Sequence, residues 1–81
     1  MSLTPAFAPD AKSQWRELDI ELQELVLDEL ENVARHPPKT QGEVRRDAFR
    51  ESSNQKHYLF IRFVVDRSTV TLVGIHHLIR D

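Results

Sequence analysis

The segment "HYLFIRFVVD", residues 57–66, constrains the fold most, because apolar residues occupy every second position along it. This spacing is typical of a β-strand, in which successive side chains point to opposite faces of the sheet. One predicted face is wholly apolar and consists of Leu59, Ile61, Phe63 and Val65. The other predicted face is mixed and consists of Tyr58, Phe60, Arg62 and Val64. The apolar face needs a covering layer, which the rest of the chain must supply.

The first half of the chain supplies this layer as two predicted helices. Residues 19–36 carry apolar side chains at three- and four-residue intervals, as in an amphipathic helix that packs on a sheet. Asp19 can cap the start of this helix, and the prolines at 37 and 38 end it because neither has an N–H to donate. A shorter helix is predicted over residues 10–18.

The apolar stripe of the second helix is wider than one sheet face requires. Ile20 and Leu27 widen it and leave only a narrow acidic band on the other side. We therefore expect part of the stripe to contact the first helix, a second subunit in a homodimer or another protein partner.

The second half of the chain predicts three strands joined by short turns. In order, the segments are strand 45–52, turn 53–56, strand 57–66, loop 66–69 and strand 70–77. A short extended piece over residues 6–8 precedes the helices. The sequence thus predicts an α+β fold: a short N-terminal strand and a helical hairpin packed on a three- to four-stranded, mainly antiparallel sheet. Eighty-one residues fit a single domain, residues 1–81.

Composition limits the classes of function. The chain has no cysteine, which excludes disulfides and cysteine zinc sites and suits a reducing cytoplasm. It has no apolar run long enough to span a membrane, so we expect a soluble, cytoplasmic protein. Residues 1–35 hold three cationic and eight acidic side chains, a formal charge of −5, whereas residues 36–81 hold eight and five, a formal charge of +3. This polarity concentrates any affinity for anionic partners in the second half.

Arg62 is the most informative polar residue, because it interrupts an otherwise apolar strand. We expect it to lie on the face away from the helices, where Arg46 or Arg50 and Arg80 could converge with it. Such a surface, bearing aromatic side chains, would suit nucleic acid through stacking and phosphate contacts. The alternative is cross-strand ion pairing with neighbouring carboxylates, and the sequence leaves both possibilities open.

The adjacent histidines His76 and His77 should point to opposite faces of the last strand, so they cannot ligate one metal together. We expect no metal site and no cofactor, since no standard ligand spacing and no Gly-rich phosphate loop occur. One histidine is predicted to be half-buried and the other to lie at the surface. A metal-independent nuclease would need only a base, an acid and cations, and the chain contains all three.

Several segments resemble the RelE/ParE toxin superfamily of bacterial toxin–antitoxin systems. "FAPDAKSQWRELD" is similar to the opening strand and first helix of that family, and "LQELVLDELENVARHPP" to its second helix. "HYLFIRFVVDRSTVTLVGIHH" is similar to the central hairpin, and "HLIRD" to the close of ParE-like members. The resemblance covers nearly the whole chain.

This resemblance implies a small toxin that a cognate antitoxin neutralises by wrapping its surface. ParE-like members inhibit DNA gyrase, whereas RelE-like members cut mRNA on the ribosome. We expect the ParE-like activity, because Leu59 stands where ribonuclease members usually have an arginine. The alternatives are a RelE-like endoribonuclease and a non-toxic interaction domain of the same fold.

The resemblance also implies roles for individual residues. Catalytic residues, if the chain is a ribonuclease, would be Tyr58, His77 and Arg80. Residues that bind the target, either gyrase or the ribosome and its mRNA, would be Arg46, Arg50, Arg62, Arg80 and His76. The antitoxin would cover the helical hairpin, where Ile20 and Leu27 are the predicted contacts.

Overall fold

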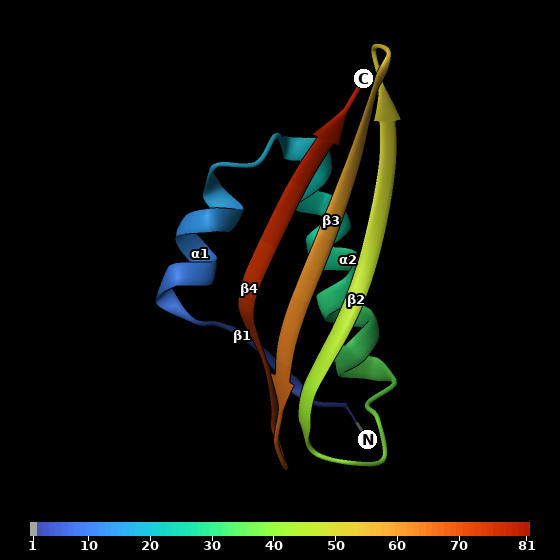
Figure 1. Ribbon diagram of the computed structural model, residues 1–81. Coiled ribbons are helices and arrows are strands. Elements are labelled where there is room, and N and C mark those ends of the chain that lie inside the picture. The colour runs from blue at the N-terminus through green and yellow to red at the C-terminus, as the bar shows by residue number, and fades with distance from the viewer. Residues whose placement is uncertain (1) are drawn as a thin grey trace.

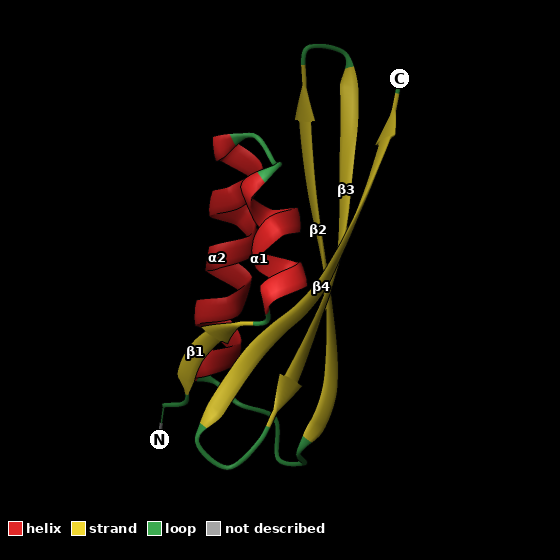
Figure 2. Ribbon diagram, turned by 90° about the vertical axis from the view of Figure 1, so that its left-hand side faces the viewer, coloured by secondary structure: helices red, strands yellow, loops and turns green. Residues whose placement is uncertain are grey.

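Four strands form one sheet, and both helices lie on the same side of it (Figures 1 and 2). The structure, a computed structural model, describes residues 2–81. Its elements are β1 (Thr4–Phe7), α1 (Pro9–Arg16), α2 (Ile20–Arg35), β2 (Gly42–Ser52), β3 (Gln55–Val65) and β4 (Thr69–Arg80). The strand order is β1-β4-β3-β2, with β1 parallel to β4 and the other pairs antiparallel. The predicted α+β class is therefore confirmed.

The two helices are tied to each other by hydrogen bonds as well as by packing. The indole Nε1 of Trp15 donates to the carbonyl of Gln23 at 3.1 Å, and Nε2 of Gln23 donates back to the carbonyl of Trp15 at 3.0 Å. The ring of Phe7, at the end of β1, meets Trp15 edge-on with centroids 5.5 Å apart. Asp19 occupies the N-cap of α2 as predicted, but its side chain makes no capping hydrogen bond.

The core lies between α2 and the apolar face of β3, as the sequence predicts. Every apolar residue assigned to that face of β3 is buried, and the residues are Leu59, Ile61, Phe63 and Val65. They pack with the buried stripe of α2, which comprises Leu22, Val26, Leu30, Val33 and Ala34. Burial of these side chains contributes about 1.5–3 kcal/mol each for the larger ones, so this layer provides most of the stabilisation.

The hairpin strands are longer than predicted, and at the β2–β3 turn the reason is a tighter turn. Ser53 and Asn54 both have positive φ angles, 49° and 69°, which is the conformation of a two-residue type I′ turn. Residues 55 and 56, predicted as part of the turn, therefore pair with Ser52 and Glu51. Strand β4 likewise continues to Arg80, three residues beyond the predicted end, and pairs with β3 as far as Lys56.

The β3–β4 turn is held by one carboxylate. Oδ1 of Asp66 accepts from the backbone N–H groups of Ser68 and Thr69, at 3.0 and 2.9 Å, and from the hydroxyl of Thr69 at 2.9 Å. These hydrogen bonds, the Ser68 backbone bond first, lower the pKa of Asp66 below its ordinary value. The hydrogen bonds therefore favour the ionised carboxylate, so the turn keeps its acceptor charged further into the acid range.

Strand β1 covers only part of the outer side of β4. It pairs with Thr69–Leu72, and the rest of β4 has no strand neighbour on that side among the described residues. The β3–β4 register shifts by one residue between Arg62 and Phe63, so that Phe63 pairs with Leu72 but Arg62 pairs with Gly74. This bulge brings a glycine opposite the arginine.

Two phenylalanines on opposite faces of β3 provide a test of the layer arrangement. Replacing the fully buried Phe63 by alanine should lower the free energy of unfolding by about 3–5 kcal/mol, because it leaves a cavity under α2. The matched change Phe60→Ala, at a side chain that is 40% exposed, should cost less than about 1.5 kcal/mol. Urea denaturation of both variants measures the difference, and equal losses would contradict the assignment of the two faces.

Candidate functional site

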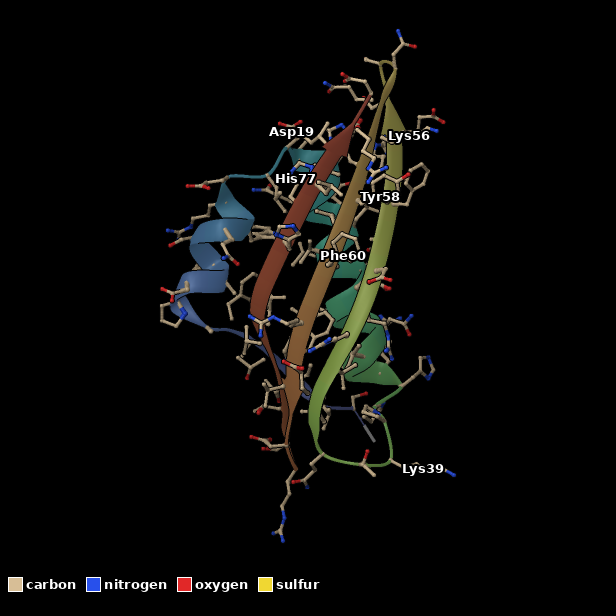
Figure 3. The ribbon with its side chains drawn as sticks, in the orientation of Figure 1. Asp19, Lys39, Lys56, Tyr58, Phe60 and His77 are labelled. Atoms are coloured by element: carbon tan, nitrogen blue, oxygen red, sulfur yellow. The ribbon has the colours of Figure 1, made fainter. Side chains whose placement is uncertain are left out.

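The face of the sheet opposite the helices, here called the open face, carries side chains in cross-strand rows. The register places Phe49, Tyr58 and Leu78 side by side in one row, from β2, β3 and β4 respectively. The next rows are Asp47, Phe60 and His76, and then Arg45, Arg62 and Gly74. Figure 3 is viewed from this face, with Tyr58 and Phe60 labelled on it.

The first two rows form an apolar and aromatic patch. Phe49, Phe60 and Leu78 are exposed. The rings of Phe49 and Tyr58 lie 5.1 Å apart, and those of Phe60 and His76 lie 6.0 Å apart. Tyr58, Phe60, Leu78 and Arg80 together line a shallow hollow. Exposed aromatic groups of this kind are characteristic of surfaces that bind a macromolecule.

Charges on the open face are nearly balanced. Arg45 and Arg62 stand directly opposite each other, and Glu43 accepts from both of them. The distances to its carboxylate are 3.1 Å from Arg45 and 3.4 Å from Arg62. The positive side chains of this face are Arg45, Lys56, Arg62 and Arg80, and the acidic ones are Glu43, Asp47 and Glu51. No large excess of positive charge results.

The predicted convergence of Arg46 and Arg50 with Arg62 is wrong, because both side chains belong to the helix-facing side of β2. Arg46 pairs with Ile61 and Arg50 with His57, which are buried beneath the helices. Arg50 forms an ion pair with Glu21 of α2 at 2.7 Å. The arginine from β2 that does reach the open face is Arg45, which the sequence reasoning missed.

The three ribonuclease candidates are not brought together. Tyr58 and Arg80 line the same hollow on the open face, whereas His77 pairs with the buried Leu59 and faces the helices. The prediction that His76 and His77 point to opposite faces is confirmed, with His76 at the surface and His77 partly buried. Leu59, which the resemblance aligns with an arginine of ribonuclease members, is fully buried in the core.

A histidine pair that the sequence did not predict lies on the helix-facing side. Nδ1 of the buried His57 is 3.0 Å from Nε2 of His77, and the rings are stacked with centroids 5.2 Å apart. Burial lowers the pKa of His77 below its ordinary value; His57 and His76 lower it further, while Asp19 at the start of α2 opposes the shift. The pair therefore favours an uncharged His77.

Two classes of site find no support in the described part of the chain. Residues 2–81 contain no group of three or more His, Cys, Asp or Glu side chains placed to hold a metal ion. Neither α1 nor α2 has the length and apolar character needed to cross a membrane.

Comparisons with known proteins identify no relative of this chain. No protein-family model, no curated protein and no solved structure matches this chain. The similarity to RelE/ParE toxins therefore rests on the sequence motifs alone.

The histidine pair predicts a loss of stability in mild acid. Because the pKa of His77 is lower in the folded state than its unperturbed value of 6.5, the unfolded chain binds the proton more readily. The free energy of unfolding should therefore be constant above about pH 7 and fall as the pH drops below the unperturbed value. Urea denaturation at a series of pH values measures this slope.

Two variants separate the pair from other acid effects. His77→Gln should flatten the slope between pH 7 and 5, and it should cost about 0.5–1.5 kcal/mol at neutral pH through loss of the hydrogen bond. His36→Gln, at an exposed position after α2, is the matched control and should keep the wild-type slope. An unchanged slope in His77→Gln would show that other groups cause the acid sensitivity.

Proposed function

We propose that this chain is the toxin of a bacterial type II toxin–antitoxin system, and that it is ParE-like. It would bind a protein target of the gyrase type through the open face, and an antitoxin bound over the helical hairpin would neutralise it. Such a target requires a cytoplasmic location.

The observation that carries this proposal is the composition of the open face. Aromatic and aliphatic side chains lie exposed at its centre, as in the core of a protein–protein interface. A surface that binds nucleic acid neutralises several phosphates with lysines and arginines. Here Glu43 already engages two of the four cations, and Asp47 and Glu51 offset others. The balance favours a protein target over mRNA.

The order of the elements also supports the proposal. One short strand, two helices and three strands follow each other along the chain, as the RelE/ParE resemblance implies. The "HLIRD" segment, residues 77–81, lies at the end of β4, so its arginine joins the hollow beside Tyr58.

The proposed antitoxin surface is the outer side of α2. Ile20 is 70% exposed, and Leu27, seven residues later, lies on the same side of the helix and is also exposed. Acidic residues between and beside them would form the polar rim of such an interface.

The ribonuclease alternative has less support. His77, its candidate acid or base, is separated from Tyr58 and Arg80 by the sheet itself. The second alternative is a non-toxic interaction domain, which would bind its partner through the same open face without arresting growth.

Growth arrest on induced expression tests the target surface. Leu78→Asp places a charge in the aromatic row and should relieve the arrest by about tenfold or more in surviving cells, as expected for the centre of an interface. Ile79→Asp is the matched control: its side chain is adjacent, is 48% exposed against 38% for Leu78, and belongs to the other face. It should leave the arrest unchanged at equal protein levels.

Gyrase supercoiling activity and mRNA integrity, followed in the same cultures, identify the target. Impaired supercoiling with intact mRNA supports the ParE-like function. Cleaved mRNA would instead favour the ribonuclease, and absence of arrest with folded protein would favour the interaction domain.

Neutralisation tests the antitoxin surface separately. Ile20→Asp should keep the arrest but weaken its relief by the co-expressed cognate antitoxin by about tenfold, because the substitution buries a charge in the proposed interface. Glu24→Gln, on the same helix, should have an effect of less than about threefold. Full neutralisation of Ile20→Asp would place the antitoxin elsewhere.

A further inference from the structure

Arg62 lies over a glycine that makes room for it. A Cβ atom at position 74 would lie 2.6 Å from Nη2 of Arg62, 3.2 Å from Nε and 3.3 Å from Cζ. Any larger side chain would displace the guanidinium group, since carbon and nitrogen atoms do not approach so closely. Gly74, brought opposite Arg62 by the neighbouring bulge, thus leaves room for the guanidinium group to lie against the sheet.

This guanidinium group is poorly paired within the described residues. Its single hydrogen bond goes to Oε1 of Glu43 at 3.4 Å, whereas Arg45 donates to Oε2 of the same carboxylate from both Nε and Nη2 at 3.1 Å. The side chain of Arg62 is 52% exposed. An arginine has five N–H donors in a fixed plane, so most of those of Arg62 are available to a ligand.

A groove of about 570 Å³ lies beside the guanidinium group, and other donors border it. Its lining includes Phe60, His76 and Gln14. Oε1 of Gln14 accepts from the backbone N–H of Ile75 at 2.9 Å, while its amide nitrogen donates to no described residue. Gln14 and His76 border the groove from α1 and β4. Arg45 borders it from β2, but its Nε and Nη2 are already engaged by Glu43.

Asp47 fixes where an anion can lie in this groove. Its carboxylate lines the β2 side, opposite Phe60, and would repel a second negative charge there. An anion would therefore lie on the β4 side, within reach of Arg62, Gln14 and His76. The row of Tyr58 and Leu78 begins next to Phe60 and His76, which line the groove.

We infer that this groove binds a glutamate or aspartate side chain of a protein partner, with Arg62 as its bidentate ligand and flanking apolar side chains of the partner on Phe60 and Leu78. The inference rests on the proposed function, because it takes the open face as the target surface. A nucleic acid would present repeated phosphates, and the balanced charge of the face provides no matching row of cations. A single carboxylate beside apolar groups matches the surface.

The test is a titration of the ¹⁵N-labelled protein with acetyl-Glu-Phe-Leu-amide, followed by NMR. Chemical-shift changes should centre on Gly74, Ile75 and the Nε–H of Arg62. The isosteric control acetyl-Gln-Phe-Leu-amide should bind about tenfold more weakly, because it loses the charge-assisted hydrogen bonds.

Variants assign the effect to the groove. Arg62→Gln should weaken the Glu peptide by about tenfold and abolish the preference over the Gln peptide. Asp47→Asn should strengthen binding of the Glu peptide by about two- to threefold by removing the repulsion. Arg67→Gln, the same change in the distant β3–β4 turn, should have no effect.

Gly74→Ala tests the geometry without removing a charge. The added methyl group should displace the guanidinium group and weaken the Glu peptide several-fold, while thermal unfolding shifts by only a few degrees. Retained affinity in this variant would overturn the role assigned to Gly74.

Two results would overturn the inference. One is equal binding of the Glu and Gln peptides, and the other is tighter binding of a uridine hexanucleotide than of the Glu peptide at matched salt. Growth arrest reports separately on the proposed function. Arrest without a preference for the Glu peptide would support the toxin function and contradict the acidic partner. Preference for the Glu peptide without arrest would support binding of a carboxylate in the groove and contradict the toxin function.

Discussion

The packing of one apolar strand face against one helix determines the arrangement of the whole molecule. The buried residues of β3, from Leu59 to Val65, pack away from water, and α2 presents the long apolar stripe that covers them. Once this contact is made, the alternation along β3 sends every even-numbered side chain to the other side. The open face is therefore a consequence of the core, and its aromatic rows occupy fixed positions.

Much of this arrangement follows from the sequence, including the faces on which the arginines of β2 lie. A turn with an even number of residues, whether two or four, pairs even-numbered positions of one strand with odd-numbered positions of the next. Arg62 must then pair with an odd-numbered residue of β2, which is Arg45. Arg46 and Arg50 fall on the helix side for the same reason. Parity of the turn, rather than proximity along the chain, assigns residues to faces.

Other features of the site cannot be read from the sequence, because they depend on register between segments far apart in the chain. The contact between His57 and His77 runs diagonally across two strands and exists only in the observed pairing. The position of Gly74 under Arg62 depends on a bulge that shifts the register by one residue. Hydrophobic alternation specifies the face of each residue but not such offsets.

The outer strand β2 has a further consequence for assembly. Six of its eleven residues are charged, four on the open face and two on the helix side: Glu43, Arg45, Asp47 and Glu51, and Arg46 and Arg50. A second copy pairing edge to edge with β2 would have to match these charges across the new strand pair, which opposes open-ended growth of the sheet. The free part of β4 is less charged, but the side chain of Gln14 already occupies its Ile75 N–H. The two edges of the sheet are thus protected against strand pairing in different ways, β2 by its charges and β4 by the side-chain amide of Gln14. The aromatic groups of the open face can therefore be exposed without the protein polymerising through its strands.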